Sequence, residues 1–315
     1  MKKLALLATA LATVSGSAVA ADMHVKAYKA PPPVIVSPWD VAFGASITNN
    51  YVFRGISQSN RNGSLAAYFE PRYNVNPNLQ LYAGVGGSSI SFTNRASAEI
   101  NVYGGIRPTF GALALDFGIF SYLYPGGQCI DLVPGGSAPF CGVGSGANAL
   151  INGNVMKKDV SFFEVFGKAT YTFTDYFALG GTVFYSPNFL NFGFDSTYAS
   201  VSAKFTAPSS MLAPDVGAYL SGEYGHQWLG TTDAFYLNTP LPDYSTWNVG
   251  VGFTYKVFTL DLRYTDTDLS KAECNAITSD FGATANPTTG VFESKWCGAS
   301  FIAKLSADVT LGQLK

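Results

Sequence analysis

Long apolar runs and charged residues are both scarce in this 315-residue sequence. After residue 20 no apolar run approaches the ~20 residues that a membrane-spanning helix needs, which excludes a helical membrane protein. Charged residues make up only 13% of the chain, against about 25% in an average soluble domain. The formal net charge of −2 lacks the basic excess that nucleic acid requires, so we expect no nucleic-acid partner.

Histidine is equally scarce, since His24 and His226 are its only copies. Hydrolases that use a serine or related nucleophile need a histidine as general base. His226 is therefore the sole candidate base for a hydrolase, which stands as a remote alternative. It adjoins Gln227 and Trp228 at the end of an expected strand, where a solvated rim residue is the usual interpretation. We expect no enzyme, and no pattern in the chain predicts a metal site or a cofactor.

The first 20 residues are predicted to be a secretory signal peptide. A positively charged start and the apolar stretch 4–14 precede Ala18-Val19-Ala20, which has the small-residue spacing of a cleavage site. The apolar core is too short for a membrane helix. Residues 21–38 follow, and their run of three prolines predicts an extended linker on the periplasmic side.

Four cysteines in an exported chain predict two disulfides. Sequence order favours Cys129–Cys141 and Cys274–Cys297, although four cysteines permit three connectivities. Free thiols or a metal site are the alternatives. No histidine lies near either pair and the compartment is oxidising, so a zinc site is not expected.

Apolar and polar or small residues alternate in segment after segment of the chain. The stretches 247–257 and 301–311 both keep this period of two. Such a period puts one set of side chains on each face of a sheet. Segments of roughly 10 residues of this kind, with aromatic residues near their ends, are the signature of a transmembrane β-barrel.

Twelve such segments are predicted to be strands. Their approximate ranges are 39–49, 64–73, 79–92, 98–108, 113–124, 159–173, 177–186, 195–207, 215–227, 245–256, 259–268 and 298–311. The connections alternate between short turns and a mostly longer set, as in outer-membrane barrels. We therefore predict an all-β fold, an antiparallel transmembrane β-barrel over residues 39–315 with short periplasmic turns and long extracellular loops. A secreted β-sandwich or propeller would alternate equally well, but the loop asymmetry, the glycine and aromatic content and the lack of a repeat of about 40–50 residues favour the barrel.

A barrel of this kind is expected in the outer membrane of a Gram-negative cell. Its short turns and both of its termini are then in the periplasm. Outer-membrane lipid and, during biogenesis, the barrel assembly machinery are its expected partners. All four cysteines then lie in or beside the two longest extracellular loops. The longest loop, 125–158, either folds into the barrel mouth as a constriction or, by default, is a flexible surface loop.

The polar face of the strands is predicted to line the lumen. A charge on the lipid face costs up to ~2–4 kcal/mol at the midplane, which drives charged residues inward. Seven acidic and seven basic residues fall on this face: Glu70, Glu99, Asp116, Glu164, Glu223, Asp261, Asp308, Arg72, Arg107, Lys168, Lys204, Lys256, Arg263 and Lys304. Many of them are expected to pair with each other, and a balanced lumen predicts weak ion selectivity. Bulky rings on the same face would leave a narrow path: Tyr68, Tyr82, Tyr103, Phe120, Tyr122, Phe162, Phe166, Phe184, Tyr198 and Tyr219.

The segment after the first strand has two interpretations. Gly55 permits a tight bend, and the five donors of Arg54 could bind lumen carboxylates or loop carbonyls. In the first interpretation, the segment 53–59 tucks back over the barrel mouth with Arg54 as its anchor. In the second, the strand simply continues, Tyr51 and Phe53 lie at the membrane interface, and Arg54 points into water.

The block Phe53-Arg54-Gly55-Ile56-Ser57-Gln58-Ser59 resembles the opening signature of the TorF-like porins of proteobacteria. The glycine-rich stretch 79–90 and the stretch 256–268 are similar as well, and the resemblance extends over most of residues 39–311. One departure is that the chain runs on through residues 312–315, whereas such barrels commonly end on an aromatic residue that the assembly machinery reads. The resemblance implies a barrel with a transport role.

Two functions from different classes follow from these patterns. The leading expectation is a porin that gives small hydrophilic solutes a narrow, weakly ion-selective passage. The rival is a closed structural or adhesive barrel, whose interior charges are paired and which acts through its extracellular loops. Neither the solute nor the oligomeric state can be inferred from the sequence.

Overall fold

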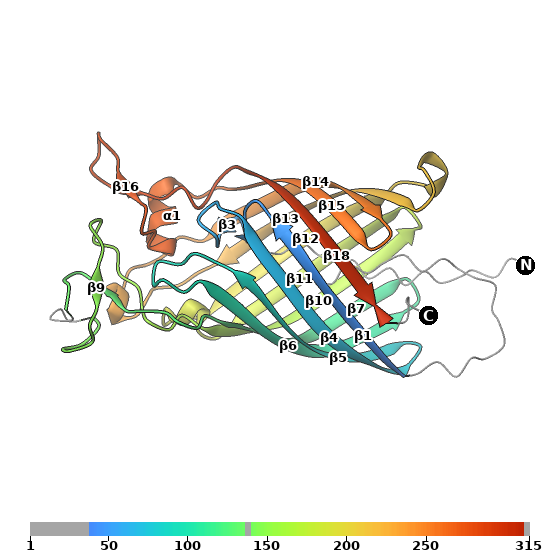
Figure 1. Ribbon diagram of the computed structural model, residues 1–315, viewed down its shortest axis with the longest axis horizontal. Helices are drawn as coiled ribbons and strands as arrows, with labels where there is room; N and C mark the ends of the chain where they lie inside the picture. The colour runs from blue at the N-terminus through green and yellow to red at the C-terminus, as the bar shows by residue number, and fades with distance from the viewer. Residues whose placement is uncertain (1–37, 136–139, 312–315) are drawn as a thin grey trace, which may run out of the picture.

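Twelve strands close into one antiparallel barrel in the computed structural model, which describes residues 38–135 and 140–311 (Figure 1). The predicted signal peptide and all but the last residue of the linker lie outside the described residues. Around the barrel the order is β1-β18-β15-β14-β13-β12-β11-β10-β7-β6-β5-β4, closing again on β1. The bounds are β1 Trp39–Thr48, β4 Ser64–Asn76, β5 Leu79–Ser89, β6 Ala98–Phe110, β7 Leu113–Leu123, β10 Phe162–Thr174, β11 Phe177–Ser186, β12 Ser196–Thr206, β13 Val216–Trp228, β14 Tyr244–Tyr255, β15 Phe258–Thr267 and β18 Ser300–Thr310.

The predicted twelve-strand antiparallel barrel is confirmed, and the strand ends agree to within a few residues. The prediction succeeds because side chains on a strand alternate between the outer and the inner face of the barrel. In β10, for example, Phe163 and Val165 are exposed on the outer face, while Glu164 and Phe166 are buried on the inner face. Each strand has 10 to 13 residues, enough to cross a bilayer at the usual tilt.

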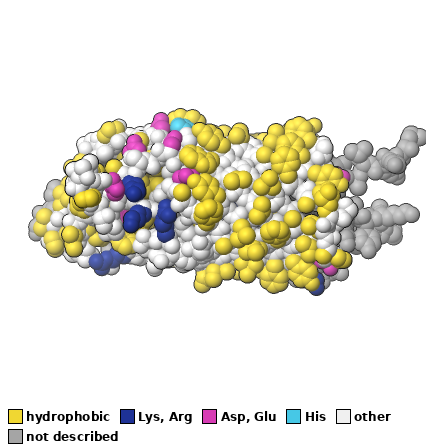
Figure 2. All heavy atoms as spheres, turned by 90° about the horizontal axis from the view of Figure 1, so that it is seen from above, with side chains coloured by type: hydrophobic (Ala, Val, Ile, Leu, Met, Phe, Trp, Pro, Cys, Tyr) yellow, Lys and Arg dark blue, Asp and Glu magenta, His cyan; other side chains and the backbone are white. Residues whose placement is uncertain are grey.

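The outer face of the barrel is an apolar belt. Exposed aliphatic and aromatic side chains occur on every strand and dominate the barrel surface, whereas charged side chains gather toward the loop end (Figure 2). Aromatic residues frame the belt at the end with the short turns, where Trp39 packs on Tyr73 and Phe177 stacks on Phe205. Tyr224, Trp228 and Phe301 are exposed at the other end. Two aromatic girdles around an apolar band are typical of a barrel embedded in lipid.

The two ends of the barrel differ in their connections (Figure 1). Short turns join the strands at one end, and the one with a regular element of its own holds the 3-10 helix η2, Ser209–Met211. The other end carries the remaining short elements: β2 Val52–Phe53, β3 Ile56–Ser57, β8 Ile130–Asp131, β9 Asn148–Ala149, η1 Phe189–Asn191, η3 Ala234–Tyr236, α1 Lys271–Thr278, β16 Thr284–Ala285 and β17 Phe292–Glu293. Among the helices of the described residues, none has the length and apolarity to cross a membrane.

Lys256 corrects one prediction, because it does not belong to the lumen set. It lies in the two-residue turn between β14 and β15, with a left-handed φ of 52°, and its side chain is exposed near the Tyr255 ring. The alternation of β14 continues in the sequence through the turn, although the strand itself ends at Tyr255. A turn residue has water beside it, so nothing drives its charge inward.

The predicted disulfides Cys129–Cys141 and Cys274–Cys297 are both present. They fasten long loops that also bind each other. Asn154 Nδ2 donates to Asn275 Oδ1 at 2.8 Å.

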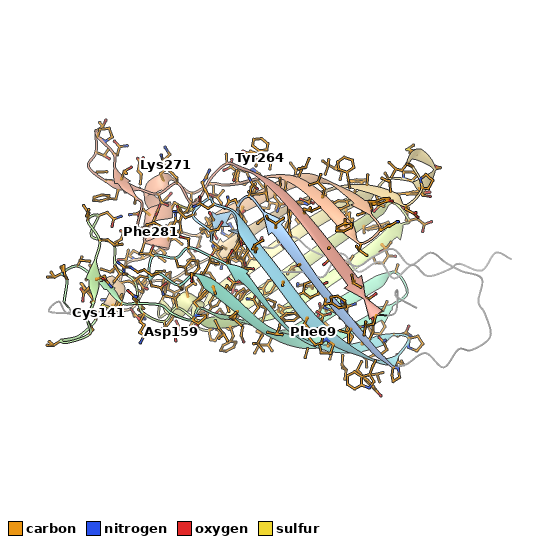
Figure 3. All side chains as sticks on the ribbon, viewed as in Figure 1. Phe69, Cys141, Asp159, Tyr264, Lys271 and Phe281 are labelled. Carbon is orange, nitrogen blue, oxygen red and sulfur yellow. A yellow bond between two sulfur atoms is a disulfide. The ribbon has the colours of Figure 1, made fainter. Side chains whose placement is uncertain are left out.

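A capping box begins α1, in which Ser270 and Glu273 exchange hydrogen bonds. These bonds hold the pKa of the Glu273 carboxyl below its ordinary value. Figure 3 shows this loop end with Cys141, Lys271 and Phe281, and the barrel wall with Phe69.

Candidate functional site: the lumen and the hairpin at its mouth

The chain leaves β1 and folds inward as a small hairpin made of β2 and β3. Most of residues 50–59 are buried. Its two-residue turn is Arg54-Gly55, with positive φ values of 46° and 80°. A turn with both central φ values positive fits the right-handed twist of a hairpin. A Cβ at Gly55 would lie 2.2 Å from Thr267 Cγ2 and 2.6 Å from Thr246 Oγ1, so only glycine fits the tip against the barrel wall.

Arg54 is the most heavily engaged side chain of the hairpin. Its Nη1 donates to Glu164 Oε1 at 2.9 Å and its Nη2 donates to Glu164 Oε2 at 2.7 Å. Nη1 also donates to Gln227 Oε1 at 2.9 Å. The guanidinium carbon lies 4.3 Å from the centroid of the Tyr198 ring. Such a two-point pair fixes both position and orientation of the guanidinium. Among the described residues, Arg54 Nε has no hydrogen-bond partner.

The hairpin spans the whole mouth of the barrel. It is attached to β1 and β4, whereas β11 lies six positions from β1 in the order of strands, on the opposite wall. Through Arg54 and Gly55 the tip contacts six adjacent strands, β10 to β15: Glu164, Phe184, Tyr198, Gln227, Tyr244 and Thr267. On another side Tyr51 Oη donates to Glu99 Oε1 at 2.9 Å. Residues 50–61, here called the mouth hairpin, therefore extend across this end of the barrel.

Below the mouth hairpin, one part of the wall holds a chain of charged side chains. Glu70 accepts from Arg72 Nε at 2.6 Å and from Arg107 Nη1 at 2.8 Å. Arg107 also pairs with Asp116 at 3.3 Å, and Tyr82 Oη donates to Asp116 at 2.6 Å. These contacts use both signs of charge and hold the carboxylates against the wall.

A second charged group lies on β15 and its neighbours. Arg263 forms a two-point pair with Asp261, with distances of 3.0 and 2.9 Å. Tyr219 Oη donates to the same carboxylate at 2.7 Å, and Arg263 Nη2 donates to Ser221 Oγ at 2.9 Å. All the charged residues predicted for the lumen, except Lys256, have their side chains on the inner face of the wall. That they line an open pore stays a prediction.

Rings on the inner wall lie over glycines of the neighbouring strand. An added Cβ at Gly84 would meet the Tyr103 ring at 2.3 Å, and one at Gly252 would meet the Tyr219 ring at 2.0 Å. Both pairs are direct cross-strand partners. Further rings lie over glycines in the same way: Tyr68 over Gly44, Phe166 over Gly118 and Tyr198 over Gly225. These rings therefore lie against the wall at these glycines.

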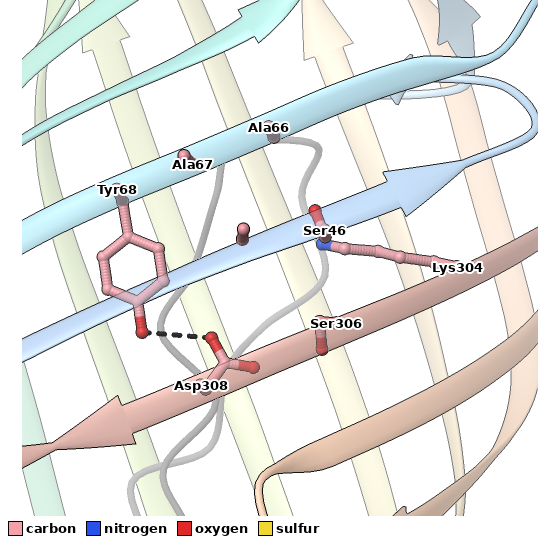
Figure 4. A pocket seen from close by; sticks show the side chains of 8 residues that line it. Ser46, Ala66, Ala67, Tyr68, Lys304, Ser306 and Asp308 are labelled. Carbon is pink, nitrogen blue, oxygen red and sulfur yellow. Dashed lines mark hydrogen bonds between the residues drawn. The ribbon is translucent and has the colours of Figure 1, made fainter.

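The lumen lysines are only half-buried, as are Arg107 and Asp116, whereas the other lumen charges are buried. The Lys168 ammonium lies 4.9 and 5.3 Å from the centroids of the Phe166 and Phe184 rings. Lys304 lines a cavity together with Ser46, Ser306 and Asp308 (Figure 4). In this cavity the Asp308 carboxylate accepts from Tyr68 Oη at 3.0 Å.

His226, the sole candidate base, lies away from the lumen on the outer face of β13. Its Nδ1 lies 3.0 Å from Ser245 Oγ, and its ring packs on Trp228. Ser245 Oγ also accepts from Tyr224 Oη at 3.0 Å. Within residues 38–135 and 140–311, no carboxylate hydrogen-bonds to the imidazole.

Several residues of the mouth contact escaped sequence reasoning. Gln227, Tyr244 and Thr246 hold or fit the hairpin tip, yet in the sequence they are ordinary members of two alternating strands. The rings that lie over glycines could have been predicted from the glycines on the inner face. Glycine in a strand interior often marks a place where another group packs closely on the backbone.

Together, the closed antiparallel barrel, its apolar belt with aromatic girdles and its polar interior define a transmembrane β-barrel of the outer-membrane type. The family model described as a bacterial protein of unknown function (Gcw_chp) matches residues 34–134, a range that includes the mouth hairpin. The resemblance to the TorF-like porins stays a prediction. A comparison with curated proteins found no match.

Solved structures with a similar arrangement include an outer membrane channel from Pseudomonas putida F1, with 11% sequence identity, a TM-score of 0.43, and coverage of 92% of this chain and 100% of that chain. OprB from Pseudomonas putida has 10% identity, a TM-score of 0.40 and coverage of 88% and 95%. A FadL homologue from Pseudomonas aeruginosa has 9% identity, a TM-score of 0.41 and coverage of 87% and 90%. Similarity at this level carries no argument about function.

Proposed function

We propose that this protein is an outer-membrane channel for small hydrophilic solutes whose mouth is closed by a releasable hairpin. In this proposal the long loops are extracellular and both termini are periplasmic. The observation that carries it is the contrast between the two parts of the interior. One locally attached segment reaches across the mouth, whereas the wall below it carries charged side chains of both signs and several of its rings are seated on glycines.

Release of the mouth hairpin is the step that opens the channel. The segment is short, and its tip is held on the far wall mainly by Arg54. A buried ion pair is weak evidence for stability, because desolvation offsets much of the attraction. The unpartnered Arg54 Nε adds a further cost to the closed state. The Arg54 contacts therefore define one closed position of the hairpin and still permit the hairpin to leave it.

Weak ion selectivity belongs to the same proposal. On the inner wall the acidic residues are matched by basic ones, and several of them form ion pairs. A strongly selective pore presents a ring of one charge sign. We also propose that the protein is not an enzyme.

The rival proposal is a closed barrel that acts through its loops. Its support is the loop end, where two disulfides and hydrogen bonds such as Asn152 Nδ2 to the Asp280 carbonyl, at 2.8 Å, build a defined surface. In that case trimming residues 125–158 would abolish binding to a partner and leave permeability unchanged.

The remote alternative, a hydrolase based on His226, has one supporting contact, the 3.0 Å approach to Ser245. A working base also needs a group that orients it, and none is present among the described residues. Ester hydrolysis by the purified barrel that is lost in Ser245→Ala would be required to revive it.

Swelling of proteoliposomes in small sugars tests the channel directly. We expect slow swelling for the wild type and faster swelling for Arg54→Ala, whose hairpin has lost its anchor. Arg95→Ala is the matched control, because Arg95 is an exposed loop arginine. A folded Arg54→Ala barrel that is as impermeable as the wild type would favour the closed-barrel rival.

A further inference from the structure

We propose that the channel prefers small anions, because the charges that its lumen exposes to water are predominantly positive. This inference rests on the proposed channel function and adds the class of solute. The ion selectivity proposed above is weak, and this inference adds which sign of ion it favours. The formal charges of the lumen do not reveal this preference, because seven acidic residues are matched by six basic residues of the wall and by Arg54 of the hairpin. The preference follows from which of these charges are exposed.

Six of the seven lumen carboxylates are withdrawn into the wall, and the seventh, Asp116, is 22% exposed but is bound by Arg107 and Tyr82. Glu70, Glu99, Glu164, Glu223, Asp261 and Asp308 are each less than a tenth exposed. Each accepts a hydrogen bond from a tyrosine or an arginine, for example Glu223 from Tyr198 Oη at 2.7 Å and Asp308 from Tyr68 Oη at 3.0 Å. A carboxylate whose oxygens are occupied by donors on the wall is poorly placed to bind a passing cation.

The lysines have the opposite arrangement. Lys168 and Lys304 are half-buried, and neither is in an ion pair with any described residue. The Lys168 contacts are two aromatic faces. Its cross-strand neighbour Asp116 is already bound by Arg107 and Tyr82. A lysine ammonium is a compact charge on a flexible stem, so it can follow a solute in the lumen.

The two lysines lie on opposite walls of the barrel. β10 and β18 lie six positions apart around the barrel, on opposite walls, and both lysines are near the middle of their strands. In the proposed channel, a solute that crosses the lumen therefore meets an ammonium group on each of two opposite walls.

Beside Lys304, the cross-strand partners Ser46 and Ser306 line the same cavity and can donate hydroxyl hydrogen bonds to an anion (Figure 4). Asp308 lines its other part, bound by Tyr68. Low-dielectric walls focus the field of such charges along the lumen.

The test is the reversal potential of single channels in a KCl gradient, recorded in the Arg54→Ala background so that the mouth is open. We expect chloride to be preferred over potassium. Lys168→Met and Lys304→Met keep the side-chain length and remove the charge, so each should lower the chloride-to-potassium permeability ratio by roughly two-fold. Lys256→Met is the matched control, because Lys256 is an exposed turn lysine, and it should leave the ratio unchanged.

The outcomes separate this inference from the channel itself. Heat-modifiable migration on gels checks the folding of each variant, and Lys168→Arg, which keeps the charge, should keep the ratio. Conducting channels that prefer potassium, or a ratio that no lysine variant changes, overturn the anion preference and leave the channel standing. Folded barrels that never conduct in any background overturn both.

Discussion

Arg54 and Glu164 are 110 residues apart in the chain and form a two-point ion pair in which both side chains are only 1% exposed. The pair joins the tip of the mouth hairpin to the barrel wall at β10. In the proposed channel, this one contact holds the hairpin across the lumen.

Breaking this pair from either side should destabilise the hairpin. Arg54→Met or Glu164→Gln leaves the other partner buried without its counter-charge, which costs about 3–5 kcal/mol. The double variant should recover part of this loss, because neither charge then remains. Thermal unfolding and proteolysis of residues 50–61 measure the effect. Equal losses in the single and double variants would mean that the two side chains do not act as a pair.

Gly55→Ala should displace the hairpin tip for a separate, steric reason. The added Cβ would lie 2.2 Å from Thr267 Cγ2, in addition to the strain of a φ of 80°. Gly126→Ala is the matched control, because its φ of 81° is equally strained and no atom lies within 4 Å of the added Cβ. The expected result is faster proteolysis of the hairpin in Gly55→Ala alone. The same rate in both variants would assign the effect to backbone strain and not to contact with the wall.

The barrel was predictable from the sequence because lipid enforces the pattern. Phe163 and Val165 must face outward and Glu164 inward, or the strand would bury a charge in the membrane. Lys256 escaped this rule since water, not lipid, surrounds a turn. The prediction for Lys256 was wrong because the cost of placing a charge in lipid no longer applies beyond the end of the strand.

The mouth contact was only half predictable. Arg54-Gly55 signalled a tight turn and a hydrogen-bonding anchor, but its partners Glu164 and Gln227 lie 110 and 173 residues further along the chain. Which residues meet there depends on the closure of the barrel and on how far the hairpin reaches across it. The seated rings likewise depend on register: Gly84 and Tyr103 become partners only once β5 and β6 are aligned.

A disulfide between the hairpin tip and the wall should lock the channel shut. A Cβ at residue 55 would lie 3.3 Å from Thr246 Cβ, close to the ~3.5–4.5 Å of natural disulfides. Because a Cβ at residue 55 would also meet Thr267 Cγ2, the variant combines Gly55→Cys and Thr246→Cys with Thr267→Ser, which removes that methyl group. It should block swelling of proteoliposomes when oxidised and permit it when reduced. The wild type treated with the same reductant controls for the native disulfides. Swelling of the oxidised, fully cross-linked variant would show that solutes bypass the hairpin.

Seated rings should set the width of the open lumen. In the Arg54→Ala background, Gly84→Ala should lower the single-channel conductance, because the Tyr103 ring must leave the wall to make room for the new Cβ. Gly181→Ala serves as the control, because the nearest atom to its added Cβ is the Ser200 carbonyl oxygen at 3.8 Å. A Gly84→Ala channel as wide as its parent would mean that the ring moves along the wall and not into the lumen.

Single-channel recording of the wild type and Arg54→Ala in planar bilayers, at equal amounts of folded protein, decides whether the hairpin closes the channel. We expect rare openings for the wild type and frequent openings of the same ion preference for Arg54→Ala. Folded Arg54→Ala barrels that never open would contradict this expectation, as would wild-type channels that are open all the time.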